Sequence, residues 1–220
     1  MLVSDHLLND IKPLRLTEKV ADVLDLMEEL KYGHLPIVEQ GTYLGIICDD
    51  DLLEVDNEQD ELSLHSRLFK GYSINSSTHL FDALRVVGEG NLSLLPVVGE
   101  AGRYLGYLSP LEIIQDLGRQ LTFTESGSVL ILQIPIRDYH LSQIAQIVEQ
   151  EDSRIIGFHL YEADESEQLY LALKINKTDL SKLIKSFERF NYNIHQVFHE
   201  SLFDNAATDR YESLMKYLNI

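Results

Sequence analysis

The sequence predicts a mixed α/β and α+β protein, built from two tandem β-α-β-β-α units followed by a β-α-β-β-α-β domain. Three observations carry this prediction: an internal repeat with a period of about 60 residues, helix-spaced apolar stripes alternating with short apolar strands, and a different order of elements after residue 127. We therefore divide the 220 residues into five parts. They are repeat 1 (1–60), repeat 2 (61–120), a linker (121–127), a third domain (128–200) and a C-terminal helix (201–220).

The two repeats align when the sequence is shifted by 60 residues, with one extra residue in the second copy after its first strand. The matching segments are 20–24 with 80–84, 35–38 with 95–98, and 43–47 with 104–108. Apolar positions fall on apolar positions, and proline and glycine recur at corresponding places. Such self-similarity indicates two copies of one structural unit.

Each repeat begins with an extended piece, at 14–16 and at 73–76, that leads into a helix. In repeat 1, Thr17 is the predicted N-cap, and the apolar residues after it have helical spacing. They are Val20, Val23, Leu24, Met27 and Leu30. Gly33 and Gly90 are predicted to end the two helices, because glycine readily adopts the left-handed conformation found there.

Two strands and a short helix complete each repeat. The sequences LPIV and LPVV predict the first of these strands, and YLGII and YLGYL the second. Gln-Gly at 40–41 and Ala-Gly at 101–102 predict the turns between them. The short helix is predicted to begin near Asp49 in repeat 1 and at Pro110 in repeat 2.

The third domain alternates strands and helices in a different order. Strands are predicted at 129–134, 154–161, 169–175 and 193–199, and helices at 141–148 and 180–187. Thr178 or Asp179 is the predicted cap of the second helix. The resulting β-α-β-β-α-β order is that of a ferredoxin-like plait.

Residues 201–220 carry a further helical pattern, in which Tyr211, Leu214 and Leu218 share one face and Thr208 or Asp209 can serve as the cap. A terminal amphipathic helix of this kind is expected to dock on its own domain. A role in dimer contact is the alternative.

The two repeats resemble a pair of cystathionine-β-synthase (CBS) domains, known together as a Bateman module. The resemblance rests on L-P-(I/V)-V and on the family motif G-h-h-(T/S)-x-x-D, which reads here Gly45-Ile-Ile-Cys-Asp-Asp-Asp51 and Gly106-Tyr-Leu-Ser-Pro-Leu-Glu112. The third domain resembles an ACT domain, and the combination is similar to bacterial acetoin-utilisation-type proteins. The resemblance implies a homodimeric regulatory protein that binds adenosine-containing ligands in two clefts between the repeats.

In the first cleft, the resemblance implies that Gly45, Cys48, Asp51 and His34 bind the ligand. In the family, the glycine admits the ligand to the backbone, a hydroxyl binds phosphate or ribose, and the aspartate accepts both ribose hydroxyls. Cys48 replaces the hydroxyl with a weaker donor. A structural interpretation stays open for each residue: Asp51 complements the helix dipole, Cys48 is a small buried side chain, and His34 is an exposed strand-edge histidine.

In the second cleft, the implied ligand-binding residues are Gly106, Ser109 and Glu112. Glu112 keeps the charge of the family's aspartate but places the carboxylate roughly 1.5 Å further out. Pro110 also removes one backbone donor near the expected anion position. The first cleft is therefore the better candidate, and Glu112 can equally serve the helix dipole.

The acidic composition narrows the choice of ligand. A net charge of −18, from 36 acidic and 18 basic side chains, argues against nucleic acid and anionic membranes as partners. Residues 1–120 carry 9 basic and 21 acidic side chains, a net charge of −12, with eight acidic residues between Asp49 and Glu61. The cations near the clefts are His34, Arg85, Arg103 and Arg119. We therefore expect AMP rather than free ATP, with ADP, ATP plus a divalent cation, and S-adenosylmethionine as further candidates, and no required cofactor.

Several further patterns bear on location and chemistry. A single cysteine, Cys48, excludes an intrachain disulfide and fits a reducing cytoplasm. The first ten residues lack the pattern of a signal peptide, and no apolar run reaches the roughly 18 residues that span a bilayer. The sequence has no G-x-S-x-G, P-loop or H-E-x-x-H motif, so we expect a non-enzymatic protein without catalytic residues.

Two candidate metal sites fail on spacing, so no metal site is expected. A calcium loop starting at Asp56 would have Glu61 where glycine is needed and Arg67 where glutamate is needed. His195 and His199 lie in a predicted strand, which places them about 13 Å apart. In the third domain, His140 stands where the ACT family has a glycine before its first helix, which favours dimerisation over amino-acid binding.

The resulting hypothesis is a cytoplasmic regulatory protein whose CBS pair senses an adenosine nucleotide. It would signal through domain or subunit rearrangement to a protein target that the sequence does not identify. Two alternatives stay open. One is a structural, dimerising module with decayed nucleotide sites, and the other is an amino-acid sensor that uses the ACT-like domain.

Overall fold

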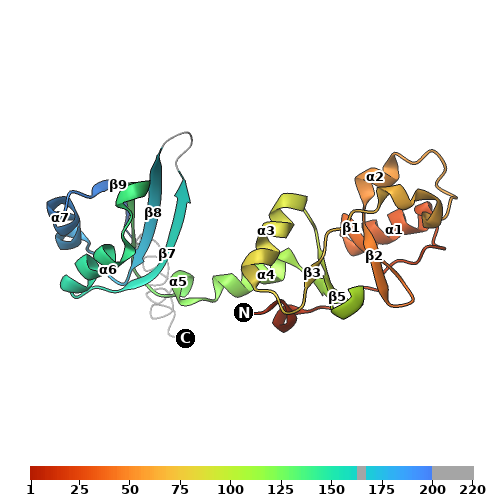
Figure 1. Cartoon of the computed structure of the whole chain (residues 1–220), viewed down its shortest axis with the longest axis horizontal. Coiled ribbons are helices and arrows are strands. Elements are labelled where there is room, and N and C mark those ends of the chain that lie inside the picture. Colours follow the sequence, from red (N-terminus) through yellow and green to blue (C-terminus); the bar gives the residue numbers. More distant parts are fainter. Residues whose placement is uncertain (163–166, 200–220) are drawn as a thin grey trace, which may run out of the picture. The chain divides into compact units, whose positions relative to one another are not determined.

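The computed structural model describes residues 1–162 and 167–199 (Figure 1). The chain divides into two compact units, Met1–Leu117 and Gly118–Ile220. Both units combine helices with sheets, so the mixed fold predicted from the sequence is confirmed. No helix in the described ranges is long and apolar enough to cross a lipid bilayer.

Repeat 1 has a helix, a strand hairpin and a short helix in the predicted order. The elements are α1 (Val20–Leu30), β1 (His34–Glu39), β2 (Thr42–Cys48) and α2 (Asp49–Leu53). The predicted strand before α1 is reduced to one parallel bridge, in which Leu14 pairs with Ile37 of β1.

Repeat 2 has the full β-α-β-β-α order. Its elements are β3 (Ile74–Asn75), α3 (Leu80–Gly90), β4 (Leu95–Val98), β5 (Tyr104–Leu108) and α4 (Pro110–Gly118). The strands form one sheet in the order β3-β4-β5, with β3 parallel and β5 antiparallel to β4. Three 3₁₀ helices also lie in the first unit: η1 (Val3–His6), η2 (Leu62–Leu68) and η3 (Glu100–Gly102).

The ends of the two long helices differ from the prediction. α1 begins at Val20 rather than after Thr17, and no side chain caps it. Its first N–H groups instead donate to backbone carbonyls of the acidic connector, the stretch from Asp49 to Glu61 that joins the two repeats. Val20 donates to Asp60 at 3.0 Å and Ala21 to Glu58 at 2.9 Å. A distant segment therefore satisfies the donors that a local cap would otherwise accept.

Neither predicted glycine occupies the left-handed position at the helix end. Lys31, with φ of 61°, follows α1, and Asn91, with φ of 47°, follows α3. Each donates its N–H to a carbonyl in the last turn, which closes the helix before Gly33 and after Gly90. The two predicted turns are correct, because residues 40–41 and 101–102 all have positive φ.

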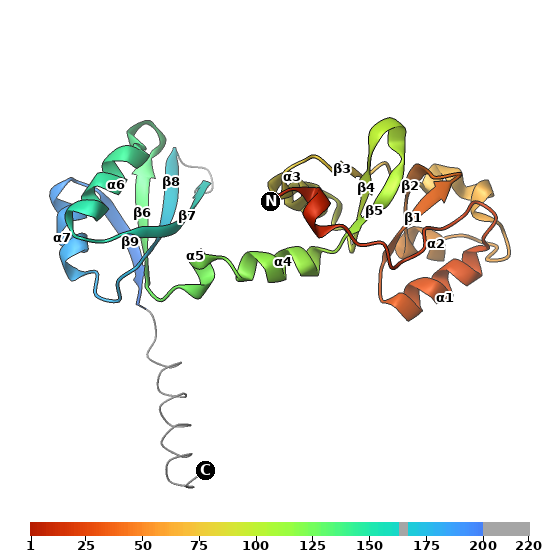
Figure 2. The ribbon, with the colours of Figure 1, turned by 90° about the horizontal axis from the view of Figure 1, so that it is seen from below.

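The chain that leads into each repeat pairs first with the other repeat. Leu8, which precedes α1 of repeat 1, exchanges two backbone hydrogen bonds of 2.9 Å with Tyr107 in β5. Lys70, which precedes β3 of repeat 2, exchanges two backbone hydrogen bonds of 2.8 Å with Ile46 in β2. Figure 2 shows the N-terminal segment passing repeat 2 before it reaches repeat 1. The two repeats are thus interlocked by reciprocal crossings.

The hydrophobic cores reflect the same interlock. Leu94 and Tyr107 of repeat 2 are buried in the core formed by α1, β1 and β2. Val3 of η1 is buried in the core beneath α3 and α4. Each repeat therefore completes its core with side chains that lie far from it in the sequence.

In its described residues, the second unit contains one antiparallel sheet and two long helices. Its elements are α5 (Leu121–Thr124), β6 (Ser128–Pro135), η4 (Ile136–Asp138), α6 (Leu141–Gln150), β7 (Ile155–Glu162), β8 (Gln168–Ile175), α7 (Ser181–Arg189) and β9 (Asn193–Phe198). The strand order is β7-β8-β6-β9, and every neighbouring pair is antiparallel. α6 and α7 lie on the same side of this sheet (Figure 2) and pack on alternate residues of β6 and β8.

The structure differs from the sequence prediction at the linker and at the start of α7. The predicted linker contains α5. α7 begins at Ser181 after Leu180, and Asp179, one of the two predicted caps, accepts the N–H of Ser181 at 2.9 Å. The predicted helix at 201–220 lies outside the described residues.

We expect Gly106→Ala to lower the free energy of unfolding by about 2–4 kcal/mol. Its φ of 149° is strained for an L-residue, and the added Cβ would collide with the carbonyl oxygen of Leu8 at the crossing. Urea unfolding measures the change. Gly88→Ala is the matched control, because Gly88 lies exposed in α3 with no atom near the added Cβ, and it should stabilise the protein by about 0.5–1 kcal/mol. Equal effects of the two substitutions would contradict the close approach.

Candidate functional site

Four side chains of the first unit gather where β2 ends and α2 begins. Cys48 is the last residue of β2, and its backbone lies opposite His34, the first residue of β1. Asp51 lies in the first turn of α2. Lys70 reaches the same place from the segment that crosses β2. The structure thus brings the predicted residues together and adds a cation that the sequence analysis missed.

Asp51 and Lys70 form an ion pair. Lys70 Nζ lies 2.6 Å from Asp51 Oδ2, and this hydrogen bond is the main cause that raises the pKa of Lys70. The Asp51 side chain is 30% exposed and the Lys70 side chain 45% exposed, so water screens their attraction. A pair of this kind contributes about 0.5–1 kcal/mol, which a ligand can overcome.

His34 serves as a hydrogen-bonding group rather than a cation. Burial lowers its pKa, and Lys70 lowers it further, while Asp49, Asp51 and Asp50 oppose the shift. Its Nδ1 lies 3.4 Å from the backbone N of Ser93 and 3.3 Å from the Ser93 hydroxyl. The ring therefore bridges repeat 1 to repeat 2, and its low pKa keeps it neutral at pH 7. It is not the exposed edge histidine of the structural interpretation.

Cys48 carries a protonated thiol. Burial raises the pKa of the thiol. A hydrogen bond of 3.4 Å, which the Cys48 thiol donates to Asp49 Oδ1, raises this pKa further because it stabilises the protonated form. The residue sits in the N-cap position of α2 without capping the helix through its side chain. The structure therefore gives Cys48 the properties of a small buried side chain.

Gly45 and Gly106 make room for the protein's own backbone. A Cβ on Gly45 would lie 2.9 Å from Phe69 Cβ and 3.2 Å from the Lys70 carbonyl oxygen. On Gly106, the Cβ would meet the carbonyl oxygen of Leu8. Each glycine therefore has a crossing segment of the chain on the side where a Cβ would point, which is by itself a sufficient reason for glycine. The role of the two glycines in ligand binding stays a prediction.

The second predicted site differs from the first in charge. Ser109 is buried at the start of α4, and Glu112 is exposed in its first turn. Leu8 pairs with β5 as Lys70 pairs with β2, so an apolar side chain takes the place of the lysine. His6 Nε2 lies 3.7 Å from Asp116 Oδ2, and none of the ion pairs found among the described residues involves Glu112.

Comparison with known proteins agrees with this geometry. The family model described as the CBS domain matches the chain twice, over residues 3–58 and 70–119. The chain carries a tandem CBS domain pair. CBS domain pairs generally act as regulatory ligand-sensing modules.

Individual relatives are distant. An uncharacterised protein of Methanocaldococcus jannaschii is 23% identical over 113 residues, which are 51% of this chain. The match spans only 43% of the length of that relative. A CBS domain pair/ACT domain protein of Thermotoga maritima is 19% identical, with a TM-score of 0.48, over 53% of this chain and 96% of that one. CBSX2 in complex with AMP is 24% identical, with a TM-score of 0.46, over 53% of this chain and 95% of that one.

The other cations proposed for the CBS pair lie elsewhere. Arg85 pairs with Glu89 along α3 at 2.9 Å. Arg103 pairs through its backbone with Thr42, where the two hairpin tips meet. Arg119 belongs to the second unit. Lys70 could not be found from a local pattern, because only the crossing of β2 by residues 69–70 brings it to Asp51.

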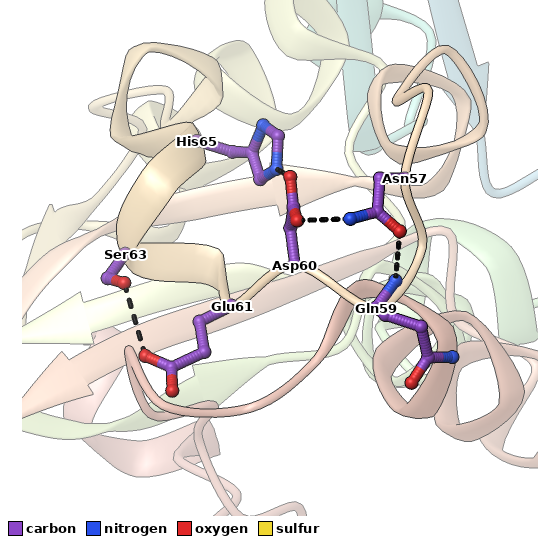
Figure 3. Close-up of polar contacts among 6 residues, drawn as sticks. All are labelled: Asn57, Gln59, Asp60, Glu61, Ser63 and His65. Atoms are coloured by element: carbon purple, nitrogen blue, oxygen red, sulfur yellow. Dashed lines mark hydrogen bonds and ion pairs between the residues drawn. The ribbon is translucent and has the colours of Figure 1, made fainter.

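The acidic connector of the CBS pair is held by its own polar contacts (Figure 3). Asp60 Oδ2 lies 3.3 Å from His65 Nε2, while Asp60 Oδ1 accepts a hydrogen bond from the Asn57 amide. The Ser63 hydroxyl donates to Glu61 at 3.3 Å. These contacts hold the loop whose carbonyl groups accept the first N–H groups of α1. The connector is therefore a structural cap as well as a solvated acidic stretch.

Two cavities lie away from these residues. One, of about 610 Å³, is lined in the first unit by Lys12, Pro13, Arg15, Glu18, Val38, Glu39, Gln40 and Gly41. The other, of about 490 Å³, is lined in the second unit by Gln133, Ile134, Pro135, Asp138, His140, Gln143, Gln168, Phe190, Asn191, Tyr192 and Asn193. His140, the residue before α6, therefore lines this cavity as well as being exposed.

His195 lies within β9, so the strand that was the reason for rejecting a metal site at His195 and His199 is present at His195.

We expect Cys48 of the native CBS pair to react with iodoacetamide at pH 8 at least about tenfold more slowly than in urea. The raised pKa lowers the thiolate fraction, and burial of the side chain also limits access of the reagent. Mass spectrometry gives a clean measurement, because the chain has one cysteine. Equal rates in the native and unfolded states would contradict the buried, protonated thiol.

Proposed function

We propose that the CBS pair binds an adenosine nucleotide with few phosphates, of the AMP type, at the site formed by His34, Cys48, Asp51 and Lys70. Binding would change the arrangement of the repeats or of subunits and so carry a regulatory signal. The observation that carries this proposal is the Asp51–Lys70 pair, because it places a carboxylate suited to ribose hydroxyls beside an ammonium suited to phosphate.

The pair also suggests how binding would be transmitted. A ribose that binds Asp51 displaces the ammonium of Lys70, which is then free to bind the phosphate. Lys70 belongs to the segment that enters repeat 2, whereas Asp51 belongs to α2 of repeat 1. A ligand that separates the two side chains therefore acts on both repeats, and its differential affinity for the two arrangements is the switch.

The local charge favours a ligand with few phosphates. Asp49 and Asp50 flank Asp51 in the first turn of α2, and Lys70 neutralises one carboxylate among the three. A triphosphate would need a divalent cation beside these carboxylates. Cys48, Asp49 and Asp50 could hold one, because their three metal-capable atoms lie within 4.8 Å of one another. ADP, ATP with such a cation, and S-adenosylmethionine are the further ligands to test.

At the second site, we expect weaker binding by Gly106, Ser109 and Glu112. Leu8 replaces the cation of the first site, and Gly106 faces the backbone of Leu8. We also propose a non-catalytic, cytoplasmic homodimer that acts on a protein target. Exposed Leu111 and Ile114 on α4 support self-association, and the raised pKa of Cys48 disfavours a thiolate nucleophile.

Two alternatives have observations in their favour. Asp51 is already paired, and Glu112 is one methylene longer than the family's aspartate, which favours a structural module with decayed sites. The β-α-β-β-α-β order and the β7-β8-β6-β9 sheet support a ferredoxin-like, ACT-like plait in the second unit. Its cavity beside His140, lined by side-chain amides, favours amino-acid sensing.

We expect Asp51→Ala to weaken the binding of both AMP and adenosine by about tenfold, because a charge-assisted hydrogen bond to ribose is lost. Lys70→Gln should weaken AMP binding by about tenfold, because the phosphate loses the ammonium. It should tighten adenosine binding by roughly two- to fivefold, because the ribose no longer has to displace Lys70 from Asp51. Isothermal titration calorimetry measures both. Arg85→Ala is the control and should bind like the wild type. An Asp51→Ala variant with full AMP affinity would refute the site.

A thermal-shift screen separates the three functions. The proposed function predicts that AMP raises the melting temperature as its concentration increases, whereas a decayed module would show no response to any nucleotide. Amino-acid sensing predicts a response to an amino acid that His140→Ala changes and Asp51→Ala does not.

A further inference from the structure

The sheet of the second unit has one covered face and one open face. α6 and α7 pack on the face that presents Leu130 and Leu132 of β6 and Leu171 and Leu173 of β8. The residues between them point to the opposite face. They are Val129, Ile131 and Gln133 of β6 and Tyr170, Ala172 and Lys174 of β8. Neither long helix of the described chain covers this second face.

α5 covers one corner of the open face and creates a groove beside it. The Thr122 hydroxyl donates to the Ile156 carbonyl at 3.3 Å, and a Cβ on Gly157 would collide with Thr122. The groove has a volume of about 460 Å³ and is largely apolar. It is lined by Thr122, Phe123, Val129, Gly157, Phe158, His159, Ala172 and Lys174.

The groove leaves one large aromatic side chain in water. Phe123 is 65% exposed, whereas Phe158 lies opposite Leu173 and so directs its ring to the other face of the sheet. Burying a phenylalanine side chain contributes about 1.5–3 kcal/mol, so an apolar partner that covers Phe123 would gain up to that amount. The groove therefore has the properties of a docking surface for an apolar partner.

A row of rings continues this surface along the sheet. Tyr161 stacks on Tyr170 with centroids 5.3 Å apart, and Tyr170 lies 4.7 Å from the ring of His195. His159 lies 6.2 Å from Tyr161. Because these rings turn their faces to one another, they do not form a free platform for a planar ligand. They extend the apolar surface toward β9 instead.

β9 ends next to the groove, and residues 200–220 follow it in the sequence. Phe198 of β9 pairs with Val129, Val129 pairs with Lys174, and Lys174 pairs with Gly157. Three strand spacings of about 4.8 Å separate β9 from β7, or about 14 Å. The nine residues 200–208 are long enough to span about twice that distance, because an extended chain covers about 3.3 Å per residue.

The sequence of this segment suits the groove. Tyr211, Leu214, Met215 and Leu218 have the spacing of one helical face, whereas Ser213 lies on the opposite face. A helix of about 12 residues is marginal by itself in water, so the pattern calls for a surface to pack against. The segment carries 4 acidic and 2 basic side chains, and Lys174 lines the groove with a positive charge.

We propose that residues 209–220 form an amphipathic helix that packs in this groove of their own chain. The helix would bury Phe123 beneath its apolar face. The tether favours this occupant over a second copy of the chain, since a segment that starts at the groove's edge has an effective concentration in the millimolar range. This inference is independent of ligand binding by the CBS pair.

A tryptophan in the groove tests the proposal, because the chain has none of its own. In the Phe123→Trp variant, we expect blue-shifted emission that is protected from acrylamide and independent of protein concentration. Adding Leu214→Asp and Leu218→Asp should shift the emission to the red and increase quenching severalfold, whereas adding Ser213→Asp should change neither. Phe81→Trp, on exposed α3, is the control for a solvated ring.

Crosslinking gives a second readout that needs no loss of packing. With Cys48→Ser, the pair Ala172→Cys and Leu214→Cys should be joined within one chain by a short bismaleimide, and Ala172→Cys with Ser213→Cys should react severalfold less. A crosslink between two chains, or concentration-dependent emission, would overturn the proposal in favour of a second copy. A solvated Phe123→Trp in the otherwise unchanged chain would overturn it outright.

Discussion

The first unit depends on the reciprocal crossing of its two repeats. Leu8 hydrogen-bonds to β5 and Lys70 to β2, so neither hairpin is complete without the chain that leads into the other repeat. Both crossings pass over a glycine, because the backbones approach too closely for a Cβ. The interlock explains why the cores exchange side chains and why the connector carbonyls can cap α1.

The same crossing creates the candidate site and makes it asymmetric. Lys70 arrives at Asp51 because residues 69–70 pair with β2, whereas the equivalent position in the other crossing is Leu8. One site therefore has a carboxylate with a movable ammonium, and the other has a carboxylate alone. In a protein with a net charge of −18, that single cation decides which site suits a phosphate.

The second unit follows a simpler constraint. Alternation along β6 and β8 sends one set of side chains toward α6 and α7 and leaves the other set on an open face. Aromatic and aliphatic groups gather on that face beyond what single solvated residues would give, and this gathering is the basis of the docking proposal.

The sequence by itself determined the periodic features: the two repeats, the hairpin turns, the strand and helix stripes, and the grouping of His34, Cys48 and Asp51. The periodic features depend on spacings within one repeat, which a single sequence displays, and the grouping of the three side chains follows from the resemblance to the CBS family. Only the tertiary structure decided the roles of Gly45, Gly106 and Lys70 and the backbone cap of α1. The physical reason is that these contacts join chain segments separated by tens to about a hundred residues, and no local pattern records which backbone crosses which strand.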